Sequence, residues 1–267
     1  MTGFSPAWLA LREPYDRAAR SRRVLAAVGQ AFTAKPAVAV TDLGCGTGAT
    51  LRALAPLLPV EQRWQLVDHD EAVLAAATAA APPGTEIVKI DLARHLEAAL
   101  DDPGDLITMS ALLDLVSAAW LDRLIAATVR LARPLYAALS YDGRVTLTPA
   151  TPDDSAVIGA VNRHQTTDKG FGAALSPAAA AAAVAGFRRA GFDVIEDRSD
   201  WHFAASDRDI QMEMIDGWAD AAGEMGVSPS ELAAWRVARR DAVAAGRSTM
   251  QIGHVDFFAR PMSMLRR

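Results

Sequence analysis

Short apolar runs alternate with helix-length segments through the first half of the chain. Runs of this length predict strands at about 37–43, 63–68, 86–91, 105–110 and 135–141, with helices between them. Strands that alternate with helices in this way predict an α/β fold. We therefore expect a doubly wound, Rossmann-like sheet that is mostly parallel, with helices on both faces. Such a sheet binds its ligands at the carboxyl ends of its strands.

After the fifth strand the alternation changes. The segments 135–141 and 144–148 flank Asp142–Gly143, a dipeptide typical of a two-residue hairpin turn. A helix over 154–165 and a glycine-rich loop over 166–172 follow. Residues 142–175 therefore predict an insertion of hairpin, helix and loop that projects over the carboxyl edge of the sheet.

The remaining segments complete the predicted sheet and its surroundings. Ser176–Pro177 is expected to open a helix that Gly191 closes, and 192–203 to form a strand. Two helices should follow, the second with a capping box from Ser228 to Glu231, and then a last strand over 251–258 as part of an antiparallel edge pair. Residues 1–35 read as helical, interrupted at Pro14, and are expected to form a lid. With no internal repeat, we expect residues 1–267 to form one domain.

Composition and charge narrow the classes of partner. The chain has 267 residues, 51% of them apolar, and a net charge of −5. With no long basic run we expect no nucleic-acid partner, and with no long apolar run we expect no membrane span. The single cysteine, Cys45, favours a reducing compartment, so cytoplasmic location is the expectation. The five histidines are scattered, which predicts no metal site.

The segment Thr41-Asp-Leu-Gly-Cys-Gly-Thr-Gly48 carries the clearest chemical signal. It lies between a predicted strand and a predicted helix, and its three glycines can adopt positive φ and bring the backbone close to a ligand. The free amides of the following helix favour such a ligand. Two cofactors remain possible: a dinucleotide, because Gly44-x-Gly46-x-x-Ala49 fits that fingerprint, and S-adenosylmethionine (SAM).

Acidic residues at the ends of three predicted strands favour SAM. Asp42 precedes the first glycine, where a carboxylate repels a pyrophosphate but suits an ammonium and a sulfonium. Asp68 ends the second strand and is placed to accept the ribose hydroxyls, and Asp91 ends the third and is placed near the adenine. Each of the last two could instead be only a helix N-cap, as Asp70 is expected to be.

This pattern resembles motif I and the following acidic positions of class I SAM-dependent methyltransferases. The resemblance covers residues 1–110 well and the rest in outline. It implies the fold described above, methyl transfer from SAM, and S-adenosylhomocysteine (SAH) as product. It also implies a set of cofactor-binding residues: Arg12, Asp42, Gly44, Cys45, Gly46, Gly48, Asp68, His69, Asp91, Leu92 and Ser110. In the N-terminal segment, Arg12 is the candidate to hold the SAM carboxylate by a bidentate contact, and an ordinary amphipathic helix is the competing interpretation.

The acceptor side offers weaker signals. His164, with a side chain whose ordinary pKa lies near neutrality, is the candidate general base, although a surface histidine on an amphipathic helix is the competing interpretation. Tyr141 is the candidate to orient an acceptor oxygen. Asp114 breaks an apolar run and is interpreted as a local cap rather than an acceptor contact.

The segment after the fourth strand, Met109 to Asp114, lacks the motifs of nucleic-acid methyltransferases. We therefore expect a small-molecule acceptor that is methylated on oxygen or nitrogen. A SAM-binding sensor or a catalytically silent subunit is the non-enzymatic alternative, and an NAD(P)-dependent oxidoreductase is the second enzymatic one. The sequence leaves the identity of the acceptor and the oligomeric state open.

Overall fold

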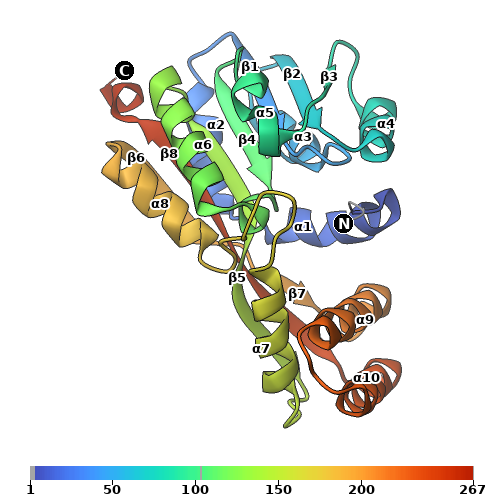
Figure 1. The fold of residues 1–267 in the computed structure, drawn as a ribbon. Coiled ribbons are helices and arrows are strands. Elements are labelled where there is room, and N and C mark those ends of the chain that lie inside the picture. The colour runs from blue at the N-terminus through green and yellow to red at the C-terminus, as the bar shows by residue number, and fades with distance from the viewer. Residues whose placement is uncertain (1–3, 103, 267) are drawn as a thin grey trace.

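A computed structural model describes residues 4–102 and 104–266 of the chain. Its centre is an eight-stranded sheet with the order β3-β2-β1-β4-β5-β8-β6, and β7 pairs with β8 beside this path (Figure 1). The strands are β1 (Ala37–Leu43), β2 (Glu61–Asp68), β3 (Glu86–Lys89), β4 (Leu106–Ser110), β5 (Leu135–Thr148), β6 (Phe192–Arg198), β7 (Trp201–Phe203) and β8 (Thr249–Pro261). Strands β1 to β5 are parallel, and β8 runs antiparallel to β5 and β6. The predicted sheet and its antiparallel edge pair are confirmed.

Helices cover both faces of this sheet, as predicted. One face carries α5 (Leu92–Ala99), α6 (Ala118–Leu131) and α8 (Ala179–Arg189). Each of these helices contributes a completely buried apolar side chain to the core: Leu96, Leu124 and Phe187. The other face carries α2 (Arg22–Phe32), α3 (Ala49–Leu54) and α4 (Glu71–Ala80). Removal of these apolar surfaces from water is the main driving force that holds the layers together.

Strands β5 and β8 stay paired beyond the ends of the neighbouring strands, and a second group of elements packs on this extension. Around this extension pack α7 (Asp154–Gln165), α9 (Arg208–Glu224) and α10 (Pro229–Ala244), together with β7 (Figure 1). We call residues 141–165 and 199–254 the arm. Its core contains three buried tryptophans, Trp201, Trp218 and Trp235. Helix α1 (Pro6–Ala19) lies between the arm and the carboxyl edge of the sheet (Figure 1).

The predicted hairpin at Asp142–Gly143 is wrong. Strand β5 runs without a turn from Leu135 to Thr148, and both flanks of the dipeptide pair with β8: Tyr141 opposite His254, and Val145 opposite Ile252. Gly143 has φ +86° at a register shift, so it forms a bulge in one long strand. The flanks pair with β8 and not with each other, which removes the reason for a turn.

Three further boundaries differ from the prediction. Helix α8 begins at Ala179, because 175–178 form a turn of their own in place of a start at Ser176–Pro177. Pro14 lies inside α1, and the helical segment breaks instead before Ser21, whose Oγ accepts a hydrogen bond from the Val24 amide at the start of α2. The predicted strand 192–203 is divided into β6 and β7. The capping box from Ser228 to Glu231 is confirmed.

Candidate functional site

The strand register brings three of the predicted cofactor residues to one level. Leu43 of β1 lies opposite Val67 of β2 and Met109 of β4. The next residue along each chain is Gly44, Asp68 and Ser110, respectively. In parallel strands these positions meet at the same edge, the carboxyl edge, where α/β sheets bind ligands.

The glycine turn has the backbone that the sequence predicts. Gly44, Gly46 and Gly48 all adopt positive φ, of +64°, +53° and +84°, a region that side chains with a Cβ disfavour. A Cβ on Gly46 would lie 3.3 Å from Leu9 Cδ1 of α1, so α1 covers this turn closely. Burial raises the pKa of the Cys45 thiol well above its ordinary value, so Cys45 remains protonated and has no nucleophilic role.

Asp42 is the buried carboxylate beneath this turn. Its Oδ1 accepts a hydrogen bond from Thr108 Oγ1 at 2.7 Å, while its Oδ2 is buried without a partner among the described residues. Burial raises the pKa of Asp42 to about 6, and the hydrogen bond from Thr108 opposes that rise. An unpartnered buried carboxylate oxygen suits a ligand with a positive charge or a hydrogen-bond donor.

Asp68 organises the backbone around the turn. Its Oδ2 accepts a hydrogen bond from the Gly46 amide at 3.0 Å, and its Oδ1 accepts from the amides of His69 and Asp70 at 2.7 and 3.2 Å. These bonds hold the glycine turn against the end of β2. The two carboxylate oxygens retain lone pairs for further donors such as hydroxyl groups.

The other predicted cofactor residues at this edge cap a helix, pack in the core or lie exposed at the surface. Asp91 caps α5 by accepting from the Ala93 amide at 3.0 Å, as the N-cap interpretation expects. The Leu92 side chain lies in the core, and its carbonyl accepts a hydrogen bond from Trp120 Nε1. The His69 side chain is exposed, with Nδ1 3.5 Å from Asp68. Asp70 caps α4, as predicted.

Arg20 is a buried cation at this edge that the sequence analysis missed. It follows α1 directly, its Nη2 donates to Ser110 Oγ at 3.1 Å, and its Nη1 donates to the Tyr136 hydroxyl at 3.2 Å. Tyr136 in turn donates to Asp256 at 3.2 Å. Arg20 also favours the ionised form of nearby Asp42. Only its position in the break between two helices distinguishes Arg20 in the sequence, and a helix break does not identify a site residue.

Arg12 lies on the arm side of α1. Its guanidinium donates to both carboxylate oxygens of Asp16, at 2.9 and 3.3 Å, and lies 5.0 Å from the ring centroid of Trp201. Trp201 Nε1 donates to Asp16 at 3.0 Å. The predicted bond from Arg12 to the SAM carboxylate therefore requires Arg12 to share its donors between Asp16 and that ligand.

The two predicted acceptor-side residues project from β5 and α7. The Tyr141 hydroxyl donates to Asn162 Oδ1 at 2.7 Å, and burial raises the pKa of Tyr141 well above its ordinary value, so the phenol is protonated. His164 Nε2 lies 3.0 Å from Glu224 of α9, and its Nδ1 lies 3.3 Å from Lys169 Nζ. A lysine ammonium only donates, so Nδ1 is the accepting nitrogen and Nε2–H donates to Glu224.

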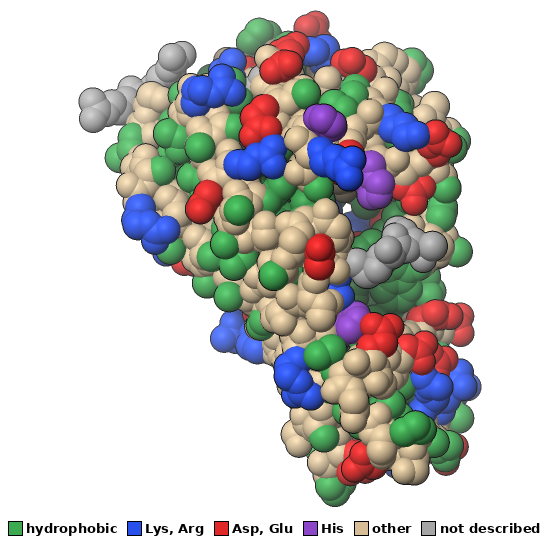
Figure 2. Space-filling view, viewed as in Figure 1, with side chains coloured by type: hydrophobic (Ala, Val, Ile, Leu, Met, Phe, Trp, Pro, Cys, Tyr) green, Lys and Arg blue, Asp and Glu red, His purple; other side chains and the backbone are tan. Residues whose placement is uncertain are grey.

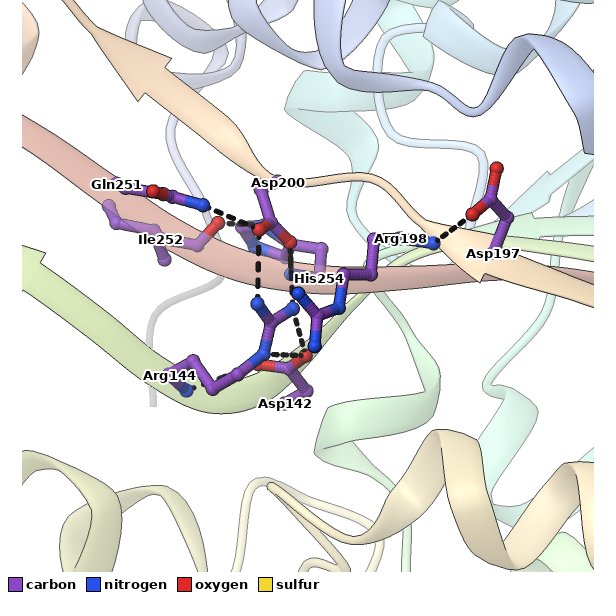
Figure 3. A network of polar contacts seen from close by, with 8 residues as sticks. All are labelled: Asp142, Arg144, Asp197, Arg198, Asp200, Gln251, Ile252 and His254. Carbon is purple, nitrogen blue, oxygen red and sulfur yellow. Dashed lines mark hydrogen bonds and ion pairs between the residues drawn. The ribbon is translucent and has the colours of Figure 1, made fainter.

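A network of charges holds the bulge in β5 against β8 (Figure 3). Arg144 donates to Asp200 at 2.7 and 3.0 Å and to Asp142 through Nε at 2.7 Å. Asp200 also accepts from Gln251 Nε2 at 2.8 Å. A Cβ on Gly253 would lie 2.2 Å from Asp142 Oδ1, so this close approach requires glycine at that position of β8.

The same network positions His254, a second buried group that the sequence analysis did not select. Asp200 accepts from the His254 amide at 3.2 Å, and His254 Nδ1 lies 3.1 Å from the Ile252 carbonyl. A carbonyl only accepts, so Nδ1 carries the proton. Burial lowers the pKa of His254 to about 3, which keeps the ring neutral. Its ring lies 4.7 Å from that of Trp201 and 6.0 Å from that of Tyr141.

On the face drawn in Figure 2, acidic and basic side chains lie interspersed over both the sheet and the arm. Within residues 4–102 and 104–266, no helix is long and apolar enough to cross a membrane. In the same part of the chain, no three His, Cys, Asp or Glu side chains are grouped as metal ligands.

The comparisons with known proteins agree with the fold. Residues 40–135 match the model of a family described as a methyltransferase domain. A cyclopropane-fatty-acyl-phospholipid synthase-like protein from Lactobacillus casei is 13% identical, with a TM-score of 0.52 over 96% of this chain and 94% of that one. Curated proteins include no match to this chain.

Two further solved structures are similar with lower scores. A SAM-dependent methyltransferase from Thiobacillus denitrificans, in complex with SAH, is 16% identical with a TM-score of 0.46, covering 97% of this chain and 100% of that one. A cyclopropane synthase from Mycobacterium tuberculosis is 13% identical with a TM-score of 0.46, covering 88% and 82%.

The fold is that of the Rossmann-like methyltransferases, as the sequence predicts. The segment that matches the methyltransferase-domain model, residues 40–135, contains the glycine turn, Asp42 and Asp68. The structure from Thiobacillus denitrificans contains SAH, which is the product of the methyl donor predicted from the sequence.

Proposed function

We propose that this protein transfers a methyl group from SAM to a small molecule, on oxygen or nitrogen. The observation that carries the proposal is the glycine turn at the carboxyl edge of the sheet, inside the segment that matches a methyltransferase domain. SAM supplies an electrophilic methyl group, so the protein needs mainly to bind and orient an acceptor and to exclude water.

The residues at the turn fit such a cofactor. Asp42 presents an unpartnered, buried Oδ2, which suits the positive charge of an ammonium. Asp68 ends β2 with lone pairs available for the two ribose hydroxyls, and Ser110 ends β4 at the same level. Two neighbouring acids, with no lysine or arginine among the described residues in an ion pair with either of them, are poorly suited to a pyrophosphate, which argues for SAM over a dinucleotide.

The arm supports a small acceptor. Helix α1 and the arm lie over the carboxyl edge, with Tyr141, Trp201 and His254 buried beside one another. Buried aromatic rings suit contact with a small organic molecule better than with a polymer. The net charge of −5 also disfavours nucleic acid.

The test is a thermal-shift series with SAM, SAH, NAD⁺ and NADP⁺. A ligand at 100 times its dissociation constant stabilises by about 2.7 kcal/mol, and at this chain length we expect a rise of roughly 5–10 °C in Tm. We expect the rise with SAM and SAH only. Asp68→Asn should weaken SAH binding by about 1–3 kcal/mol, because it removes charge-assisted hydrogen bonds to the ribose.

The matched control is Asp122→Asn, on the exposed side of α6, which should bind SAH like the unaltered protein. A shift with a nicotinamide nucleotide, or with none of the four, would overturn the proposal. Unchanged SAH affinity in Asp68→Asn would overturn the ribose assignment alone. SAH binding without turnover on any metabolite of a broad panel would favour the sensor or silent subunit.

A further inference from the structure

Asp114 lies just beyond the end of β4, near Tyr141 of β5. Ala111 has φ +49°, so the chain turns sharply after Ser110 and places Leu112 against Gly44, where an added Cβ would lie 3.2 Å from a Leu112 methyl group. Asp114 follows two residues later, in a short 3₁₀ turn (Leu113–Leu115). No side-chain hydrogen bond caps the start of this turn at Leu112.

The Asp114 carboxyl group is free of strong partners. Its Oδ1 is buried and has no hydrogen-bond partner among the described residues, although the residue as a whole is only partly buried. The groups that face it are Arg12 from α1 and the backbone amide of Tyr141 from β5. Arg12 lies beyond ion-pair distance of Asp114 and is bonded to Asp16. Burial raises the pKa of Asp114 to about 6, and Arg12 and the amides oppose that rise.

The other buried titratable groups near the aromatic rings cannot accept a proton near neutral pH. His254 has a pKa of about 3, so it is too weak a base, and Tyr141 is protonated and donates its own proton to Asn162. Asp16 is held by Arg12 and Trp201. Asp142 and Asp200 are held by Arg144, so among the described residues Asp114 is the remaining carboxylate near these rings that has a buried oxygen without a partner.

We propose that Asp114 accepts the hydrogen bond, and then the proton, of a hydroxyl or amine acceptor that binds beside Trp201, Tyr141 and His254. This inference rests on the function proposed above. The O or N lone pair of the acceptor forms the new bond to the methyl carbon. The carbon–sulfur bond breaks with its electron pair on sulfur, and the O–H or N–H proton passes to Asp114. Charge balances, because the sulfonium cation and the carboxylate anion are both neutralised.

The first experiment measures binding to the SAH complex with three matched aromatic probes. Phenol and benzylamine carry a donor, and benzoate carries only an accepting, negative group. We expect saturable binding of phenol or benzylamine and none of benzoate, because benzoate would meet an unpaired carboxylate. Asp114→Asn should weaken binding of the preferred probe at least tenfold. Equal binding of benzoate, no binding of any probe, or no effect of Asp114→Asn would each overturn the inference.

A second measurement follows the titration of the carboxyl group in the unaltered protein. With ¹³C-aspartate label and bound SAH, the Asp114 carboxyl signal should titrate near pH 6 and move to lower pH when benzylamine binds. Asp114→Asn assigns this signal, and Asp122→Asn should leave it in place. A carboxyl signal for Asp114 that titrates at the ordinary value, or ignores benzylamine, would contradict the proposal.

The pH dependence of methyl transfer to the preferred probe then separates the two candidate bases. We expect the rise in rate through pH 6 to disappear in Asp114→Asn and to persist in His164→Ala. If the rise in rate through pH 6 disappears only in His164→Ala, His164 is the base and the inference is overturned. SAH binding distinguishes the two levels of failure. If the unaltered protein does not bind SAH, the proposed function itself fails; if SAH binds normally while the probes and the titration are unaffected by Asp114→Asn, only the role of Asp114 fails.

Discussion

The sheet and the arm reach their polar sites by different routes. At the glycine turn, Asp42 and Asp68 come from neighbouring parallel strands. Asp42 lies two residues before Gly44, and Asp68 is the last residue of β2. In the arm, Tyr141 and His254 meet only because two long antiparallel strands cross the molecule together. The first site is encoded in short segments, whereas the second depends on pairing between distant segments. A cofactor site that a short segment encodes can therefore be combined with an acceptor site that distant strands assemble.

The two parts also handle buried charge differently. Asp42 is buried with one oxygen unpartnered, and this keeps a place for a cationic ligand. Asp154 in the arm is fully engaged: it accepts from Trp235 Nε1 at 2.8 Å and from Arg239 Nε at 2.9 Å, and Arg239 is 1% exposed. The buried carboxylate in the sheet remains available to a ligand, whereas the buried ion pair in the arm stabilises the fold. Substitutions should therefore have opposite effects in the two parts.

The largest effect is expected at Asp154. Asp154→Ala should lower the free energy of unfolding by about 3–5 kcal/mol, because it leaves the buried guanidinium of Arg239 without its carboxylate. Urea denaturation measures the change. The control is Asp153→Ala, an exposed neighbour with no side-chain hydrogen bond at the helix start, which should change little. Equal stability of the two variants would mean that the arm does not rely on this ion pair.

At Asp42 we expect a substitution to raise the free energy of unfolding near neutral pH rather than lower it. The folded pKa of about 6 exceeds the ordinary value of 3.8, so between these two values the folded chain binds more protons than the unfolded chain. Stability should therefore fall as the pH rises through this window, by roughly 2–3 kcal/mol in total. Asp42→Asn should remove this loss and be more stable at pH 8 by a similar amount, with little change at pH 4, while binding SAM more weakly. Denaturation of both proteins at pH 4 and pH 8 measures the gain in stability that Asp42→Asn produces. A gain that is larger at pH 4 than at pH 8 would contradict the expected sign.

A smaller effect is expected where α1 meets the glycine turn. Glu13 accepts from Arg52 Nε and Nη2 at 2.6 and 2.7 Å, and Arg52 Nη1 donates to the Thr47 carbonyl at 2.7 Å. Glu13→Gln should lower stability by about 1 kcal/mol or less, because the pair is partly exposed. We expect SAH to dissociate severalfold faster in stopped-flow measurements, since α1 covers the turn. Glu213→Gln, exposed on α9, is the control, and identical dissociation rates would show that α1 does not limit release.

The sequence predicts the sheet well because its signals are local. The glycines, the alternation of strands and helices, and Asp42 and Asp68 all lie within short segments whose geometry depends on nearest neighbours. The prediction failed at Asp142–Gly143, where the turn signal is local but the pairing partner, β8, lies far along the chain. A favourable local turn does not form when a distant strand offers hydrogen bonds to both flanks.

The candidate acceptor site could be predicted only in part, for the same reason. The sequence selects Tyr141, which lies beside the aromatic rings, and offers Asp114 as either a cap or an acceptor contact, whereas Arg20 and His254 stand out only when their neighbours are known. Asp114 reads as a polar break in an apolar run, and nothing in that run indicates that its Oδ1 is left without a partner. The unmet hydrogen-bonding capacity of a buried atom is a property of packing, so it cannot be read from spacing.

Helix α1 touches both sites at once. Through Glu13 and Leu9 it contacts the glycine turn, and through Arg12 and Asp16 it contacts Trp201 of the arm. A movement of α1 that admits a ligand at one end alters the contacts at the other end. If the two proposed ligands bind at these ends, this fourteen-residue helix couples their equilibria, and each ligand changes the affinity of the other by the same factor.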